Sequence, residues 1–344
     1  MVSNKSRILV TGGAGYLGSV LTGKLLMKGY KVRILDELWH GDIGITRYLN
    51  NPHFELMKGN MRDLQVAQAA VKDVETVIHL AAIVGDPACS LIHDATIGLN
   101  YLATSLLAQC GKYYGVQRFI FASTCSVYGF GDMVFTEESK LNPVSLYARS
   151  KIQAEEALLE IASDTFRPII LRKSTVYGLS PRMRFDLVVN LLVAKAVLEK
   201  QIPIFGGSQW RPFLHVSDAA EAYMACIEAP IDLVGGQTFN VGDNNQNFQL
   251  IDVGRIVKDY VPEADLICHQ QDLDIRNYRV DFSKIEKKLG FRSRLTVSDG
   301  VREIVEAFQE GRFTSYNEKT YNNFLQDEIE HYKNILRYDS PDKF

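Results

Sequence analysis

A tyrosine and a lysine in the stretch "YARSK" have the types and spacing for acid–base chemistry. Tyr147 and Lys151 are four residues apart in a segment that predicts a helix over 147–163, so both side chains lie on one face. An ammonium beside a phenol lowers the phenol's pKa, and such a phenol can take a proton from a substrate hydroxyl as hydride leaves for a nicotinamide. Lys151 can also bind the nicotinamide ribose. A tyrosine and a lysine four residues apart also occur often on the solvated face of a helix. Of the sixteen tyrosines in this chain, however, only Tyr147 has a lysine four residues later. We interpret the pair as catalytic.

A glycine-rich turn predicts a site for a dinucleotide. Gly12, Gly15 and Gly18 follow the strand "RILVTGG" and lead into a helix expected over about 17–28. Glycines permit a tight turn and the close approach of a pyrophosphate, which the helix N-terminus attracts. Asp36 ends the next strand, where a carboxylate accepts hydrogen bonds from ribose hydroxyls and repels a 2′-phosphate. NAD is therefore favoured over NADP, since Arg33 is a weak candidate for binding that phosphate.

Small polar residues end the apolar run "RFIFASTCS", where a buried strand is expected to meet a loop. They could cap a turn, hold a nucleophilic cysteine or supply a hydroxyl to another reaction; the residues are Ser123, Thr124, Cys125 and Ser126. No histidine is placed in the sequence to activate Cys125, so we interpret it as a small buried residue at the strand end.

Three arginines indicate recognition of an anion. Arg211 lies in "FGGSQWRPF", and Arg182 and Arg184 lie in "PRMRFD". Each alone is more often a surface residue, but the planar guanidinium makes bidentate, charge-assisted hydrogen bonds that suit a diphosphate. His215 is interpreted as structural, packing the return strand.

Alternating strands and helices must position these residues. Repeated β–α–β order predicts an α/β fold with a Rossmann-type doubly wound parallel sheet. The second half is less regular, with a loop over 205–213, and predicts a smaller mixed α/β C-terminal substrate domain. The expected strands are 7–13, 31–36, 53–60, 76–82, 118–124 and 168–178, and the expected helices are 17–28, 64–71, 95–114, 147–163, 185–199 and 217–228. We expect residues 1–178 plus 213–241 to bind NAD, 179–212 plus 242–325 to bind substrate, and 326–344 to form a C-terminal helix and tail.

Composition argues against several classes of protein. The 344 residues are 46% hydrophobic, enough for a sizeable core, and the net charge of −3 argues against nucleic-acid binding. We find neither the apolar core of a signal peptide nor an apolar run that approaches a membrane span. The five cysteines form no C-x-x-C pair, so we expect no metal site, no disulfide framework and a reducing cytoplasm.

Several motifs together resemble one protein family over roughly residues 5–310. They are "TGGAGYLG", Asp36, "HLAA", "STCSVYG", "YARSK", "LRKSTVYG", "RPFLHVSDAAEAY" and "YRVDFSKIEKKLGF", in that order. The chain resembles the extended short-chain dehydrogenase/reductases and, more narrowly, their NAD-dependent nucleotide-sugar epimerase/dehydratase family. The resemblance implies that the chain is an enzyme with NAD as its cofactor.

The resemblance also implies roles by position. Thr124 matches the hydroxyl that binds the sugar O4, and Asn60 with Met61 matches the adenine contact, although the family more often has Asp at position 60. The segment Lys173 to Thr175 lies against nicotinamide and substrate in the family, which usually has Asn where this chain has Thr175. Arg276 and Tyr278 lie in a late segment that completes the nucleotide pocket. The implied cofactor residues are Gly12, Gly15, Tyr16, Leu17, Gly18, Asp36, Asn60, Met61, Leu80, Ala81, Ala82, Asn100, Ser123, Tyr147 and Lys151, and the implied substrate residues are Asp86, Thr124, Cys125, Ser126, Thr175, Arg184, Arg211 and Arg276.

Family members share oxidation of a sugar C4 hydroxyl and differ in the step that follows. The 4,6-dehydratases commonly carry an Asp–Glu pair directly after the catalytic Ser/Thr, and the decarboxylases carry a glutamate there. This chain has Cys125 and Ser126 there, and neither is a good proton-transfer group, so a dehydratase is less favoured. C4 epimerisation of a nucleotide-activated hexose fits the residues that remain. A C4 dehydrogenase or a ketosugar reductase is the alternative, because it would use the same residues and differ only in whether hydride is returned. Asp86 could contact the sugar or act as an additional acid or base. An NAD(P)-sensing or RNA-associated protein is the non-enzymatic alternative. The resemblance also implies a homodimer through a four-helix bundle of 95–114 and 147–163. From the charge and the lack of long apolar runs we expect no nucleic-acid or membrane partner.

Overall fold

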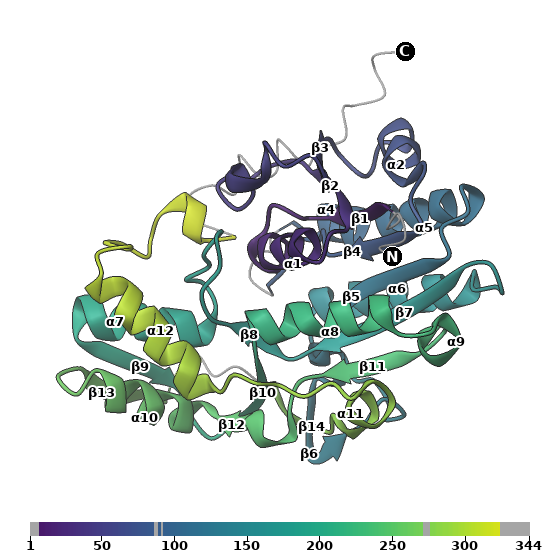
Figure 1. Cartoon of the computed structure of the whole chain (residues 1–344). Coiled ribbons are helices and arrows are strands. Elements are labelled where there is room, and N and C mark those ends of the chain that lie inside the picture. The colour runs from purple at the N-terminus through teal and green to yellow at the C-terminus, as the bar shows by residue number, and fades with distance from the viewer. Residues whose placement is uncertain (1–6, 86–88, 91, 271–275, 324–344) are drawn as a thin grey trace.

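A parallel β-sheet forms the centre of the molecule. The computed structural model describes residues 7–85, 89–90, 92–270 and 276–323 (Figure 1). In these residues the large sheet has seven parallel strands in the order β3-β2-β1-β4-β5-β7-β11. The strands are β1 (Arg7–Thr11), β2 (Lys31–Asp36), β3 (Phe54–Lys58), β4 (Thr76–His79), β5 (Arg118–Thr124), β7 (Arg167–Lys173) and β11 (Thr238–Val241). The doubly wound sheet expected from the β–α–β pattern is confirmed.

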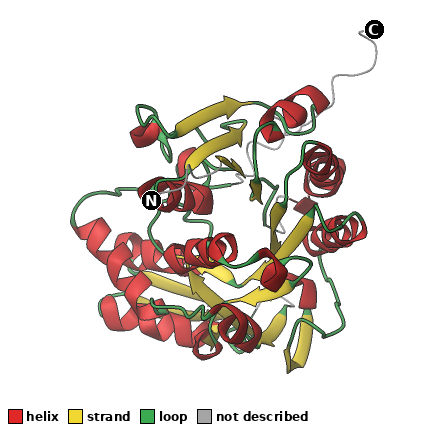
Figure 2. Ribbon diagram, turned by 45° about the vertical axis from the view of Figure 1, so that its right-hand side comes forward, coloured by secondary structure: helices red, strands yellow, loops and turns green. Residues whose placement is uncertain are grey.

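Helices cover both faces of this sheet, which is why its central strands are buried along almost their whole length. One hydrophobic cluster joins the sheet to α1 (Tyr16–Met27) and α8 (Val216–Glu228). A second cluster, on the other face, joins it to α2 (Leu64–Val71), α5 (Ala103–Tyr113) and α6 (Leu146–Glu160). The layers of red helices around yellow strands are visible in Figure 2.

A smaller mixed region packs beside the carboxyl ends of the large sheet (Figure 1). Its own core includes Phe185, Phe213, Val253 and Ile304. Its strands form small sheets in the orders β12-β10-β8, β13-β9 and β14-β6. These are β6 (Phe130–Phe135), β8 (Thr175–Tyr177), β9 (Gln201–Phe205), β10 (Trp210–His215), β12 (Asn247–Gln249), β13 (Asp265–His269) and β14 (Asn277–Val280). The helices of this region are α7 (Val188–Glu199), α10 (Leu250–Tyr260) and α12 (Val297–Gln309). The short helices α9 (Ile231–Val234) and α11 (Ser283–Leu289) pack instead in the first cluster of the large sheet.

Several elements differ from the expected ones because of contacts between distant residues. The helix expected over 95–114 consists of α4 (His93–Ile97), a π-helical turn (Gly98–Leu102) and α5. The expected loop over 205–213 ends at Trp210, where β10 begins, since that strand pairs with β8 and β12. Helix α7 begins at Val188 rather than near 185, and the N–H of Phe185 donates instead to the carbonyl of Tyr321 at 2.8 Å.

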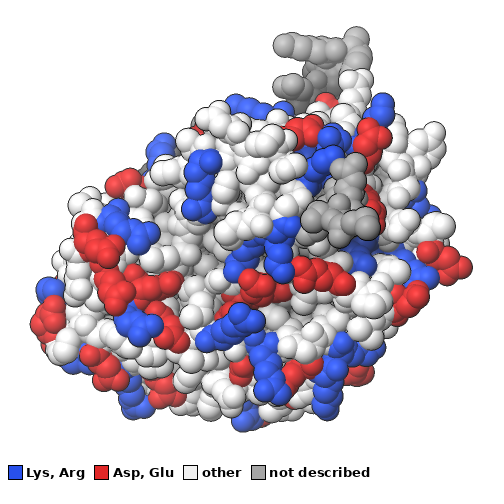
Figure 3. All heavy atoms as spheres, viewed as in Figure 1, with Lys and Arg blue, Asp and Glu red and all other residues white. Residues whose placement is uncertain are grey.

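The topology switches direction between β1 and β4, and ligand sites of doubly wound sheets lie at the carboxyl ends of the strands beside such a switch. No helix of the described part of the chain is long and apolar enough to cross a membrane. On the face shown in Figure 3, acidic and basic side chains are interspersed. The division into two ligand-binding domains stays a prediction, and the expected C-terminal helix and tail over 326–344 lie outside the described residues.

Candidate functional site

The glycine turn after β1 leaves room for a ligand against the backbone. Gly12 has a φ of +70°, and a Cβ there would lie 2.8 Å from the backbone nitrogen of Ala81, at the end of β4. A Cβ on Gly18 would overlap the carbonyl oxygen of Gly12. Helix α1 begins directly after Gly15 with no side chain capping it, so its first N–H groups face outward as an anion site. The turn therefore fits a pyrophosphate.

Asp36 ties this turn to the end of β2. Its carboxylate accepts hydrogen bonds from the N–H of Ala14 at 3.0 Å and of Leu38 at 2.8 Å. Burial raises the pKa of Asp36, and the two N–H donors oppose that rise. The carboxylate also lines a cavity, where its remaining acceptor capacity suits the hydroxyls of a ribose.

One cavity of about 650 Å³ runs from the glycine turn to the ends of β5 and β7. Both regions of the molecule contribute to its walls, which is the arrangement that a dinucleotide and a second ligand need in order to meet. Most of the expected site residues line it: Gly12, Gly15, Tyr16, Leu17, Gly18, Asp36, Met61, Leu80, Ala81, Ala82, Ser123, Thr124, Ser126, Tyr147, Thr175, Arg184, Arg211 and Arg276.

Four expected site residues are absent from this lining, and Asp86 lies outside the described residues. The side-chain oxygen of Asn60 accepts from the backbone N–H and side-chain Nε of Arg62. Asn100, in the π turn, is fully buried and bonds both backbone groups of Ile83, at 2.8 and 2.9 Å. The other two residues, Cys125 and Lys151, are buried beneath the lining. Arg33 is engaged as well, because its guanidinium bonds Glu55 and the end of α2.

Tyr147 and Lys151 lie on the same face of α6, which begins after the capping hydroxyl of Ser145. Tyr147 lines the cavity, whereas Lys151 lies beneath it and is 2% exposed. The Lys151 amine is 4.7 Å from the ring centroid of Phe121 and 5.9 Å from that of Tyr147. Burial, with a smaller contribution from the charge of Lys173, lowers the pKa of Lys151 to about 7.

A buried ion pair holds this face of α6 against the sheet. Glu155, one turn beyond Lys151, accepts hydrogen bonds from Arg172 on β7, the shortest at 2.7 Å. Its carboxylate also accepts from the hydroxyl of Ser123 on β5. Both charged side chains are under a tenth exposed, so the pair resists exchange with water. It places Tyr147 opposite the ends of β5 and β7.

The polar cluster after β5 divides into cavity residues and a buried thiol. Thr124 lines the cavity, and its hydroxyl accepts from the N–H of Ser126 at 3.1 Å. Cys125 points away, donates its thiol to the carbonyl of Arg172 and is fully buried. Burial raises the pKa of the Cys125 thiol far above its usual value, so this cysteine is a poor nucleophile.

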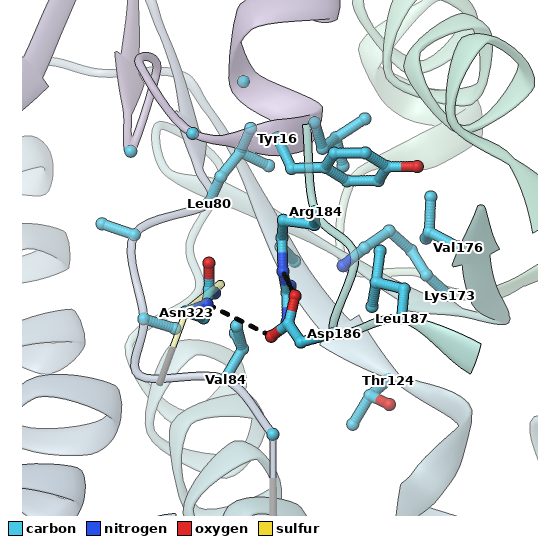
Figure 4. Close-up of a pocket in the computed structure, with 18 of the residues that line it drawn as sticks. Tyr16, Leu80, Val84, Thr124, Lys173, Val176, Arg184, Asp186, Leu187 and Asn323 are labelled. Carbon is cyan, nitrogen blue, oxygen red and sulfur yellow. Dashed lines mark hydrogen bonds and ion pairs between the residues drawn. The ribbon is translucent and has the colours of Figure 1, made fainter. Parts of the chain in front are cut away.

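An ion pair lies in the middle of the cavity. Arg184 donates to both carboxylate oxygens of Asp186, at 2.9 and 2.6 Å, beneath the ring of Tyr16 (Figure 4). Arg182, from the same loop, is 1% exposed and donates to the side-chain oxygen of Asn323 at 2.5 Å. The loop that carries these two arginines lies beside the glycine turn, since Ser180, two residues before Arg182, donates to the carbonyl of Tyr16 at 2.7 Å. The assignment of Arg184 to substrate stays a prediction.

Arg211 and Arg276 come from the smaller region. Arg211 is 4% exposed, and its guanidinium is 5.3 Å from the ring centroid of Tyr278. It also donates to the carbonyls of Trp210 and Arg276, which joins β10 to the start of β14. The Tyr278 hydroxyl is 3.4 Å from that of Ser126. The arginines of this region therefore lie next to the strand end that holds Thr124.

The cavity also has charged residues to which sequence reasoning gave no individual role: Glu37, Asp186 and Lys173, the last within a segment expected to lie against nicotinamide and substrate. Lys173, the last residue of β7, directs its amine into the cavity (Figure 4) and donates to the carbonyl of Ser123 at 3.0 Å. Burial lowers the pKa of Lys173 to about 8. The available signal was its position at the end of a strand beside the one that ends at Thr124, but the order of the strands is needed to use that signal.

Comparisons with known proteins agree with this geometry. The family model "NAD dependent epimerase/dehydratase family" matches residues 8–242. An uncharacterized UDP-glucose epimerase of Bacillus subtilis is 30% identical, covering 86% of this chain and 95% of the relative. UDP-glucuronic acid decarboxylase 1 of Arabidopsis thaliana is 28% identical, covering 88% of this chain and 70% of the relative. The structure of MoeE5 in complex with UDP-glucuronic acid and NAD superposes with a TM-score of 0.78 at 26% identity, covering 89% and 99% of the two chains.

Proposed function

The chain belongs to the NAD-dependent epimerase/dehydratase family, and on that premise we propose that it catalyses C4 epimerisation of a nucleotide-activated hexose through a 4-keto sugar. It is an enzyme of the extended short-chain dehydrogenase/reductase type, and NAD is its cofactor. The observation that carries the proposal is the meeting of Tyr147, Thr124 and Arg211 around one cavity that also holds the glycine turn.

Tyr147 is the proposed general base for the C4 hydroxyl. Its ring borders the cavity, and the Lys151 amine, 5.9 Å from the ring centroid, stabilises negative charge on the phenol oxygen while it is protonated. Thr124 supplies the hydroxyl that orients the sugar O4. Bound NAD supplies the acceptor, and later the donor, of a hydride.

Arg211 and Arg276 are proposed to hold the nucleotide diphosphate. Both line the cavity from the smaller region, and a guanidinium can offer paired N–H groups to phosphate oxygens. This leaves the sugar between the diphosphate and Thr124. The sugar can rotate there while the nucleotide stays bound, so that the hydride returns to the opposite face of C4 and the proton returns to O4.

The residues after Thr124 support epimerisation over elimination. A 4,6-dehydration needs an acid and a base near C5 and C6, and the buried thiol of Cys125 reaches neither. Ser126 lines the cavity, but a serine hydroxyl is a weak acid and a weak base near neutral pH. The C4 chemistry requires only Tyr147, Lys151 and Thr124.

Tyr147→Phe tests the proposal because it removes one oxygen and keeps the ring. We expect turnover of a nucleotide sugar to fall by several orders of magnitude while NAD and the nucleotide still bind. Tyr113→Phe, on an α5 tyrosine that is 83% exposed, serves as the matched control and should leave turnover unchanged. Unchanged turnover in Tyr147→Phe would refute the assignment of the base.

A further inference from the structure

Lys173 is a cation in the catalytic part of the cavity with no assigned role. It ends β7, directly beside Thr124 in the register of the neighbouring strand β5. Adjacent strands are about 4.8 Å apart, so the two side chains leave the sheet as neighbours. Both line the cavity, and the Lys173 amine is directed into it (Figure 4).

The charge of Lys173 has no counter-ion in the described part of the chain. Its amine has three donor hydrogens and, among the described residues, makes one hydrogen bond, at 3.0 Å to the neutral carbonyl of Ser123. Two carboxylates of this part of the molecule already have partners, since Asp186, which lines the same cavity, pairs with Arg184, and Glu155 on α6 pairs with Arg172. A cation removed from water is costly unless an anion or several acceptors compensate it. An anionic ligand would provide that compensation.

The position of Lys173 limits where on the ligand the anion lies. The diphosphate is assigned to Arg211 and Arg276, in the smaller region. Thr124 is assigned to the sugar O4, so its neighbour Lys173 reaches substituents one or two carbons from C4. On a hexopyranose the group there that can carry a full negative charge is a carboxylate at C6.

We propose that Lys173 forms a carboxylate subsite at the sugar end of the cavity, which makes the substrate a nucleotide-activated hexuronic acid rather than a neutral hexose. This inference rests on the proposed function, because it takes the position of C4 from the roles of Tyr147 and Thr124. Thr124 and Lys173 then bind O4 and the C6 carboxylate from adjacent strand ends.

The same contact protects the carboxylate during the reaction. A 4-keto uronic acid is a β-keto acid, which loses carbon dioxide when the C5–C6 bond breaks and its electron pair moves through C5 to the C4 carbonyl oxygen. That movement takes negative charge away from the carboxylate. An ammonium paired with the carboxylate stabilises the charge in the starting state and so opposes the loss, and the C4 epimer keeps its C6.

The experiment compares neutral and acidic sugars on the same nucleotide, with UDP-glucose and UDP-glucuronic acid first and the dTDP derivatives next. We expect wild-type kcat/KM to be at least tenfold higher for the uronic acid, as befits one charged hydrogen bond. Lys173→Gln keeps a donor for Ser123 and removes the charge. Its kcat/KM should fall at least tenfold for UDP-glucuronic acid and only slightly for UDP-glucose. A larger share of its product should be carbon dioxide and a UDP-linked pentose.

Two further variants make the outcome specific. Lys173→Arg keeps the charge and should recover most of the preference for the uronic acid. Lys140→Gln, at an exposed position, removes a lysine elsewhere and should match the wild type. Equal use of UDP-glucose and UDP-glucuronic acid by the wild type, or an unchanged preference in Lys173→Gln, overturns the subsite and leaves the proposed function standing. No reaction with either sugar on any nucleotide overturns the proposed function, and the subsite with it.

Discussion

Lys151 should make the stability of the ligand-free protein depend on pH near neutrality. Its amine lies against Phe121 and is 2% exposed, and burial lowers its pKa to about 7. A lysine in the unfolded chain has a pKa near 10.4. Between these values the unfolded state binds a proton that the folded state has released, so the free energy of unfolding rises with pH.

The magnitude follows from the two pKa values. Below about pH 7 Lys151 is charged in both the folded and the unfolded state, so it contributes little to the change of the free energy of unfolding with pH. Integration of the proton difference from pH 7 to pH 8.5 gives a gain in the free energy of unfolding on the order of 2 kcal/mol for this group. Lys173, with a pKa lowered to about 8, adds to this rise of the free energy of unfolding with pH. The buried thiols of Cys125 and Cys226 reduce the rise at higher pH, because burial raises their pKa values.

Lys151→Met isolates the contribution of Lys151, because the other groups are present in both proteins. Urea unfolding of the nucleotide-free proteins should be measured between about pH 7 and pH 8.5. We expect the wild type to gain stability on the order of 2 kcal/mol relative to Lys151→Met over this range. Parallel stability curves, or a wild type that loses stability relative to the variant, would show that the Lys151 amine is not held in a buried site that discharges it.

Three other predictions concern the cofactor, the substrate and the assembly. Asp36→Ala should weaken NAD binding at least tenfold in titration calorimetry, since a ribose loses its acceptor; a wild type that binds NADP as tightly as NAD would contradict the role given to Asp36. Thr124→Ala should lower kcat by a smaller factor than Tyr147→Phe does, and unaltered kinetics would remove Thr124 from the mechanism. The chain should form a homodimer by light scattering at micromolar concentration through α5 and α6, near the exposed Leu102 and Leu159, and Leu102→Glu should weaken the dimer. A monomeric wild type would contradict this arrangement.

Local sequence carried enough information for the cofactor side of the site. The glycine turn and Asp36 lie within one β–α–β unit, and their contacts, such as that from Ala14 to Asp36, join residues close in sequence. The spacing of Tyr147 and Lys151 likewise predicts a shared helix face. These features follow from the geometry of one helix and two strands, so their positions could be predicted before the fold was known.

The rest of the site depends on pairings between distant residues, which a single sequence does not reveal. The burial of Lys151 on α6 depends on Phe121 of strand β5 and on the ion pair between Glu155 and Arg172, which holds α6 in place. The cavity position of Lys173 depends on β7 lying beside β5. The contact of Arg182 with Asn323 spans 141 positions of the chain. The π-helical turn that contains Asn100 does not follow from the helical pattern around it, because the Asn100 side chain is hydrogen-bonded to the backbone of Ile83.

The most direct test of the account is the product formed in deuterium oxide from a nucleotide sugar that the enzyme accepts. Mass spectrometry and NMR should show inversion at C4, with all six sugar carbons kept and no solvent deuterium on any of them, because the hydride that leaves C4 returns to C4. Deuterium at C3 or C5, or a product that has lost water or carbon dioxide, would contradict an enzyme whose chemistry is confined to C4.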